Sequence, residues 1–230
     1  MNVYPLLSKS KVGYFYIPDN FMHPSLQQEL EKINPNVYGC PAIGGLNNRL
    51  YSLPNLLDIE IEFGIDNGEP YYNYMINDKV HNTTADMHNL VRDMLSVKVT
   101  DDGKAVLQQT ISIIFVTDTK DIEMTLMHPQ QNLDKENCVA VIGAFYPYAW
   151  LRPINLAWVQ EDITKPAKLN LKKGISSITI FFNKPISLEQ IEPTDKVLKY
   201  MSLSSGSINF HRNIRTIFDY IIKKRPKHLL

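Results

Sequence analysis

Hydrophobic and polar residues alternate in several short stretches of the sequence. In residues 58–63, Asp-Ile-Glu-Ile-Glu-Phe, a strand would carry three apolar side chains on one face and three carboxylates on the other. Residues 110–116 are instead mostly apolar and β-branched, which is typical of a strand covered on both faces. The alternation recurs in four further segments: Ile122–Leu126, Ile154–Val159, Leu169–Leu171 and Ile178–Phe182. These patterns predict a series of short β-strands.

Turn-forming residues separate these segments. The tripeptides Asp-Asn-Gly at 66–68 and Asp-Asp-Gly at 101–103 are typical of tight turns between strands. Lys173-Gly174 lies between two alternating segments. We therefore expect residues 169–171 and 178–182 to form a hairpin.

Apolar residues at helical spacing predict helices outside the strand segments. Thr83 or Thr84 is a candidate N-cap for the helix expected at 87–95. The last helix would carry an apolar stripe that includes Phe210 and Ile221, and we expect the last two helices to cover one side or end of the sheets. The four helical segments are 24–33, 87–95, 194–201 and 210–221.

Many short strands with a few peripheral helices predict a mainly β fold, α+β only at its margins. We expect an antiparallel β-sandwich or a jelly-roll-like arrangement with a C-terminal helix. A chain of 230 residues can form one domain, with a β-rich core at about 37–195 and a helical segment at about 194–225. We expect the following side chains to share one core: Ile59, Ile61, Phe63, Ile113, Phe115, Ile178 and Ile180.

Composition narrows the possible partners. Twenty-four basic residues balance twenty-four acidic ones, so global charge does not favour nucleic acid or an anionic membrane. Cys40 and Cys138 lack the spacing of a zinc site or a disulfide framework, and we expect both to be buried thiols. The first twenty residues lack the apolar region of a signal peptide, and no run of about 18 apolar residues occurs, so we expect neither secretion by that route nor a membrane span.

The order of several blocks resembles a known family. Cys40-Pro41, the strand DIEIEF, and the segments SIIFVTDTKDIEMTLMHPQ, GAFYPYAWLRPINLAWV and LKKGISSITIFFNKP are similar to uncharacterised proteins encoded by marine tailed phages, the cyanophage type. They also resemble, more distantly, a bacterial domain of unknown function. The resemblance covers roughly residues 37–195. It implies a phage source, a place in the host cytoplasm or the virion, and a β-sandwich, and it says nothing about catalysis.

The sequence contains no glycine loop for phosphates and no nucleophile elbow, and we expect no cofactor. His81 and His88 are seven residues apart, with Asp86 and His128 as further possible ligands, but exposed or capping histidines explain them better than a metal site.

Three carboxylates flank the central strands. Asp118, Asp121 and Glu123 would act as acid or base only if a pocket desolvated one of them, and solvated strand ends explain them better. A basic cluster at the C-terminus, Lys223, Lys224, Arg225 and Lys227, would either touch phosphates or favour the dipole of the last helix.

The segment 146–158 is the strongest candidate for a ligand or partner surface. Tyr146, Tyr148 and Trp150 alternate before Arg152, and Trp158 follows in the next strand. Such residues are enriched at binding hot spots. The alternative is a structural clasp, in which Arg152 packs against the ring of Trp150 or pairs with a buried acid.

These observations favour a non-catalytic phage accessory or virion-associated protein, which acts through self-assembly or contact with other phage proteins. One alternative is a cupin-like or jelly-roll-like protein with a small-molecule pocket near Trp150, Arg152 and Trp158. The other is a host-takeover factor that binds nucleic acid through the basic C-terminal helix.

Overall fold

The computed structural model describes residues 9–16, 49–55, 58–77, 85–127, 134–172, 176–206 and 214–230. These residues form fifteen strands and three helices, with one helix at the C-terminal end. The helix expected at 24–33 and residues 37–48 of the expected core lie outside the described residues. The described helices are α3 (Ala85–Met94), α4 (Asp195–Gly206) and α5 (Ile214–Lys224).

The strands build four sheets, and the mainly β fold predicted from the sequence is confirmed. The first sheet has the order β15-β1-β7, with β1 (Ser10–Tyr16), β7 (Ile113–Val116) and β15 (Ile186–Gln190). The second has the order β10-β12-β6-β5, with β5 (Leu95–Val99), β6 (Ala105–Ile111), β10 (Cys138–Val141) and β12 (Ile154–Gln160). Every strand pair in these two sheets is antiparallel except β1 with β15.

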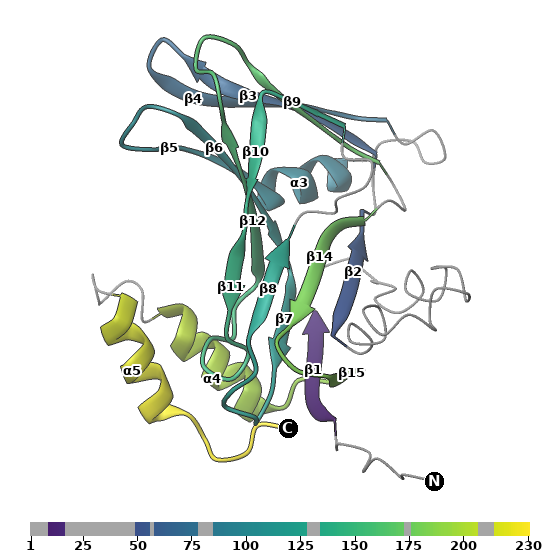
Figure 1. Cartoon of the computed structure of the whole chain (residues 1–230), viewed down its shortest axis with the longest axis vertical. Coiled ribbons are helices and arrows are strands. Elements are labelled where there is room, and N and C mark those ends of the chain that lie inside the picture. The colour runs from purple at the N-terminus through teal and green to yellow at the C-terminus, as the bar shows by residue number, and fades with distance from the viewer. Residues whose placement is uncertain are drawn as a thin grey trace, which may run out of the picture.

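The other two sheets are antiparallel throughout. The third has the order β11-β8-β14-β2, with β2 (Leu50–Pro54), β8 (Met124–Met127), β11 (Gly143–Phe145) and β14 (Ser176–Phe182). The fourth has the order β4-β3-β13-β9, with β3 (Ile59–Asp66), β4 (Glu69–Ile76), β9 (Asp134–Glu136) and β13 (Ala167–Leu171). In Figure 1 this fourth sheet lies at the upper end of the molecule and helices α4 and α5 lie at the lower end.

Alternation along the chain places the core side chains. Strand β3 buries Ile59, Ile61 and Phe63 while Glu60 stays exposed, and β12 buries every second residue from Ile154 to Gln160. All seven residues predicted to share a core belong to one hydrophobic cluster. The predicted core is therefore confirmed.

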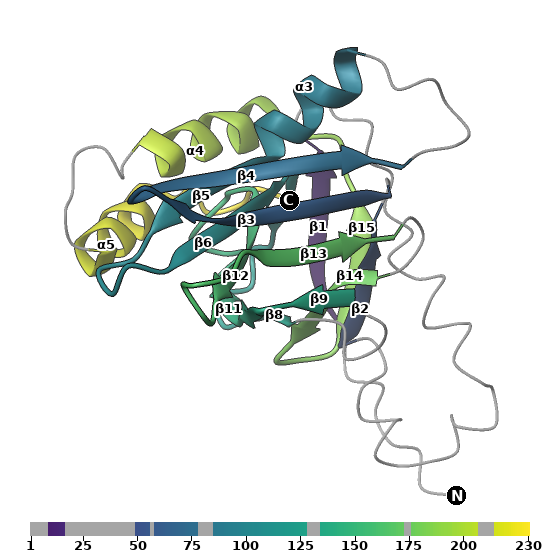
Figure 2. The ribbon, with the colours of Figure 1, turned by 90° about the horizontal axis from the view of Figure 1, so that it is seen from above.

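A second, smaller cluster forms beneath the helices. Strand β7 is buried along its whole length because Ile113 and Phe115 face the main core, whereas Ile114 and Val116 face α4 and α5. The prediction of a strand covered on both faces is thus correct for β7. Figure 2, seen from above, shows the four strands β4, β3, β13 and β9 side by side, with α3 next to β4.

The structure corrects the expected hairpin between residues 169–171 and 178–182. Strand β13 pairs with β3 and β9, whereas β14 pairs with β2 and β8 in a different sheet. Alternation tells which face of a strand is buried but not which strand lies beside it, and the turn residues suggested the nearest partner in sequence.

Other elements also differ from the expected ones. Residues 110–116 are split at Ser112 between β6 and β7, which belong to different sheets. Strand β9 consists of three exposed charged residues at the edge of a sheet, so no apolar periodicity signals it. Helix α4 extends to Gly206, and Thr194 is its N-cap, because the Val197 backbone N–H donates to Thr194 Oγ1 at 3.4 Å.

Candidate functional site

The aromatic segment before β12 packs against the C-terminal helix α5. The rings of Tyr146 and Trp150 both meet the ring of Phe218 edge-on, with centroids 5.5 and 5.1 Å apart and interplanar angles of 90° and 87°. Tyr146 is 37% exposed, so its outer edge still reaches solvent. The main contact of these two side chains is therefore within the chain.

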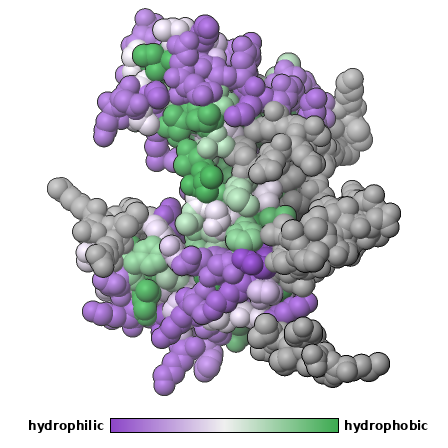
Figure 3. Space-filling model, in the orientation of Figure 1, coloured by the Kyte–Doolittle hydropathy of each residue, from purple (hydrophilic) through white to green (hydrophobic). Residues whose placement is uncertain are grey.

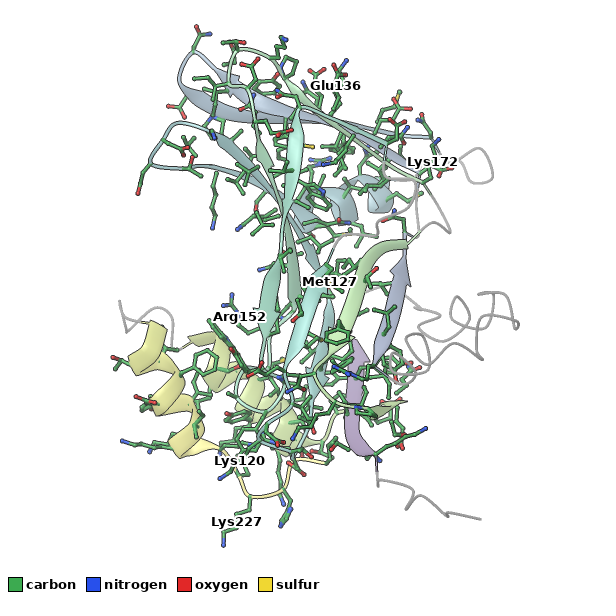
Figure 4. The ribbon with its side chains drawn as sticks, in the orientation of Figure 1. Lys120, Met127, Glu136, Arg152, Lys172 and Lys227 are labelled. Carbon is green, nitrogen blue, oxygen red and sulfur yellow. The ribbon has the colours of Figure 1, made fainter. Side chains whose placement is uncertain are left out.

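Arg152 lies over the ring of Trp150. The guanidinium carbon is 4.8 Å from the ring centroid, and burial lowers the pKa of Arg152. This is the clasp geometry considered as the alternative in the sequence analysis. Figure 4 labels Arg152 beside the lower half of the strand column, next to the helices.

The ring of Tyr148 packs against Arg225, a cation of the C-terminal basic cluster. The guanidinium carbon of Arg225 lies 4.1 Å from the centroid of Tyr148 and 5.4 Å from that of Tyr200. Its Nη2 donates to the carbonyl of Thr117 and to Oδ1 of Asp118, both at 2.7 Å. With only 1% of its side chain exposed, Arg225 cannot bind phosphates at the surface.

Asp118 ties the end of the chain to the sheets. Besides Arg225, its carboxylate accepts hydrogen bonds from the backbone N–H groups of Leu229, at 2.9 and 3.2 Å, and Leu230, at 3.1 Å. Leu229 is buried in the cluster under α4 and α5. Asp118 is thus a structural acceptor, and Lys223, Lys224 and Lys227 remain as exposed cations.

Trp158 does not belong to this surface. It is fully buried in the main core, because β12 turns its even-numbered residues inward. The sequence grouped it with Trp150 and Arg152 by proximity, but those two residues precede β12, and Trp150 packs on Phe218 of α5 rather than in the main core. Trp158 therefore has no solvent-exposed surface beside Trp150 and Arg152.

The remaining candidate residues have structural contacts. Tyr74 Oη lies 3.0 Å from His88 Nδ1, and Asp121 forms an ion pair with Lys184. Cys138 is 1% exposed, which confirms the expected buried cysteine at this position, and burial raises the pKa of its thiol to about 11. Four of the candidates lie outside the described residues: His81, His128, Cys40 and the side chain of Asp86. Within the described residues, no group of three His, Cys, Asp or Glu side chains could hold a metal ion.

An exposed edge of the sheets carries a feature that the sequence analysis missed. Strand β10 pairs only with β12 and β11 pairs only with β8 among the described strands, so each has one open side. The two strands follow one another along Cys138–Phe145, a stretch without a charged residue or proline. Val139, Val141 and Ile142 are exposed to 41%, 44% and 69%.

The other edges of the described sheets are protected. Strands β4, β5, β9 and β15 each contain a charged residue, β2 contains Pro54, and β7 is buried throughout. Natural sheets use these devices to prevent pairing with another chain. Among the eight sheet edges described, only β10 and β11 are both uncharged and exposed.

The apolar character continues from this edge onto the outer face of the sheet. Val139 lies opposite Val159, and Val141 opposite Ala157, whereas Cys138 and Ala140 face the core. Figure 3 shows apolar surface in the middle of this side of the molecule, between the hydrophilic ends, over the column formed by β10 and β12 in Figure 1. We call Cys138–Phe145 the open edge.

A polar groove lies on the outer face of the fourth sheet. It encloses about 480 Å³ and is lined by Glu60, Glu62, Asp134, Glu136 and Lys168, among others. Cross-strand register explains this arrangement, since Glu62 lies opposite Lys168 and Lys168 opposite Glu136. The groove is an exposed strand face with interleaved charges rather than a desolvated pocket.

Comparison with known proteins found no match for this chain. The chain matches no protein-family model, no curated protein sequence and no solved structure. Within the described residues, none of the helices has the length and apolar character needed to cross a membrane.

Proposed function

We propose that this protein is a non-catalytic accessory or virion-associated protein of a tailed phage, which acts through self-assembly or contact with other phage proteins. The phage source is proposed from the sequence resemblance. The observation that supports this mode of action is the open edge, where exposed backbone groups and exposed apolar side chains coincide.

The packing of the aromatic segment supports placing the contact at the open edge. Tyr146, Trp150 and Tyr148 use their ring faces and edges on Phe218 and Arg225 of the same chain. A partner that used the same ring surfaces would have to displace Phe218 of α5 or Arg225, and only the outer edge of Tyr146 remains accessible. At the open edge, by contrast, no residue is charged or a proline, although the ammonium of Lys135 donates to the Cys138 carbonyl at 2.9 Å.

The experiment is a comparison of two lysine variants in a phage that encodes this chain. Val141→Lys places a charge on the open edge, and Val99→Lys places one on β5, the opposite edge of the same sheet. The two valines are matched, since each is 44% exposed. We expect Val141→Lys to lower the yield of infectious particles or the amount of this protein in purified particles, and Val99→Lys to change neither. Equal results for the two variants would contradict the proposal.

The groove on the fourth sheet supports a second candidate, a protein that binds a small polar ligand. Its carboxylates and Lys168 would contact a ligand that carries both positive and negative groups. A thermal-shift screen of small zwitterions with wild-type protein and Glu62→Ala tests it. A ligand that stabilises only the wild type would favour this candidate over protein contact.

A further inference from the structure

We infer that copies of this chain bind one another head to tail, with the acidic upper end of one copy on the basic lower end of the next. The acidic face is the outer face of the fourth sheet, and the basic end is the last turn of α5 together with residues 225–230. Neither surface includes a residue of the open edge. The inference names a further contact between copies and does not rest on the proposed function.

The two ends of the molecule carry opposite charge, although the whole chain has a formal net charge of +0. The four strands of the fourth sheet contain six acidic and two basic residues, whereas α4 and residues 214–230 contain seven basic and two acidic ones. Figure 4 labels Glu136 at the upper end and Lys227 at the lower end. Because the two charges lie at opposite ends of one chain, they can neutralise each other only between two copies.

Four carboxylates share the acidic face. Strand register puts Glu62 and Glu136 on either side of Lys168 in one row, and Glu60 and Asp134 in the next row. Lys168 is the one basic residue in these two rows, so the carboxylates outnumber the cations and repel one another. Cations from outside would lower the electrostatic energy of this face.

The basic end carries three exposed lysines that form no ion pair within the described part of the chain: Lys223, Lys224 and Lys227. Two acids near them are already neutralised, since Asp118 pairs with Arg225 and Asp121 pairs with Lys184. The positive charge of the lower end is therefore free to meet a partner, and the acidic face of a second copy supplies the complementary charge.

Each of the two surfaces also has an exposed apolar side chain. Met75, which is 54% exposed, borders the groove on the acidic face, and Ile222, which is 42% exposed, precedes the lysines on α5. Protein interfaces commonly place apolar contacts inside a charged rim. The dimensions agree as well, because the eleven residues of α5 extend about 16 Å and four strands span about 14 Å.

This contact is heterologous, since each copy contributes a different surface to each of its two neighbours. Association then continues beyond a dimer, into a ring or an open chain of copies. The charges are exposed, so added salt screens them. The mass in solution should rise with protein concentration at low salt and fall to that of the monomer at high salt.

The test is sedimentation velocity of the full chain over a wide range of protein concentration, at about 0.03 M salt and at about 1 M salt, where the Debye length is about 3 Å. We expect Glu62→Lys and Lys224→Glu each to associate at least about tenfold more weakly than the wild type, because each change places like charges opposite one another. The controls Asp93→Lys and Lys98→Glu make the same charge changes at exposed positions outside both surfaces and should associate as the wild type does. If Glu62→Lys does not fold, Glu136→Lys, at an exposed position of the same row, replaces it.

Mixing the two variants shows whether the acidic face binds the basic end. The mixture combines the intact acidic face of Lys224→Glu with the intact basic end of Glu62→Lys, so we expect a complex that neither variant forms alone. A wild type that is monomeric at low salt, association that persists unchanged at high salt, or a mixture that stays monomeric would overturn the inference. A monomeric wild type that binds a short DNA oligonucleotide through Lys224 would assign the basic end to nucleic acid instead.

Failure of this inference is distinguishable from failure of the proposed function. Val141→Lys should leave the head-to-tail association unchanged. If Val141→Lys abolishes association and the charge reversals do not, copies meet at the open edge and the inference is wrong. If the charge reversals abolish association while Val141→Lys and Val99→Lys give equal particle yields, the inference stands and the proposed function at the open edge is wrong.

Discussion

The buried guanidinium of Arg225 allows a quantitative test of how the C-terminal segment is held. Arg225→Met keeps a side chain of similar length and removes the charge. The change deletes the hydrogen bonds to the Thr117 carbonyl and the Asp118 carboxylate, together with the contact over the ring of Tyr148. Asp118 then retains only the backbone donors of the last two residues.

The magnitude follows from the burial of the two partners. Removing one partner of a buried ion pair costs about 3–5 kcal/mol. Two features lower this value here: the Asp118 side chain is 26% exposed, and Nε and Nη1 of Arg225 have no hydrogen-bond partner among the described residues. We therefore expect a loss of about 2–3 kcal/mol in the free energy of unfolding, which lowers Tm by roughly 4–12 °C.

Urea unfolding followed by circular dichroism measures this loss. The control is Lys224→Met, which makes the same replacement at an exposed neighbouring residue at the end of α5 and should stay within about 0.5 kcal/mol of the wild type. If Arg225→Met and Lys224→Met unfold at the same urea concentration, the buried ion pair does not stabilise the fold, and Arg225 and Asp118 do not hold the C-terminal segment as argued above.

Three further predictions concern the core and the aromatic segment. Burial raises the Cys138 pKa to about 11 from 9.0. In a Cys40→Ser background, the native thiol should therefore react with a disulfide reagent at pH 8 far more slowly than the thiol of the urea-unfolded chain. The stability that the buried neutral thiol contributes is fully present below about pH 9 and is lost as the pH rises through 11. Trp158→Ala should cost about 3–5 kcal/mol in urea unfolding, because it empties a site in the main core; a loss below about 1 kcal/mol would contradict its placement there. Tyr148→Ala and Arg152→Ala should lower Tm without changing the sedimenting mass, and weakened association in a fully stable variant would instead assign these residues to the partner surface.

Local pattern was sufficient to identify the buried faces of most strands. Ile59, Ile61 and Phe63 alternate with carboxylates, and burial of one face is the only arrangement that removes apolar area from water and leaves the charges solvated. The turn at Asn67-Gly68 could also be read from sequence, since both residues adopt positive φ, 50° and 84°, at the tip of the β3–β4 hairpin.

The candidate site was only partly readable from the sequence. The concentration of aromatic residues around Trp150 is evident in the sequence. Their partner, Phe218, lies 68 residues further along the chain, and the cation over Tyr148 is Arg225 of the C-terminal basic cluster. Composition identifies side chains capable of binding, whereas the contacts that occupy them come from elements remote in sequence.

The sequence by itself determined the buried faces of most strands, the turn between β3 and β4 and that the fold is mainly β, because hydrophobic periodicity and turn chemistry act over a few neighbouring residues. Only the tertiary structure decided which strands pair, and hence that β13 and β14 lie in different sheets. It also decided which strands are left at an edge. An apolar stretch such as Cys138–Phe145 reads like a central strand, and its open side exists only because other strands occupy the remaining positions in the sheets.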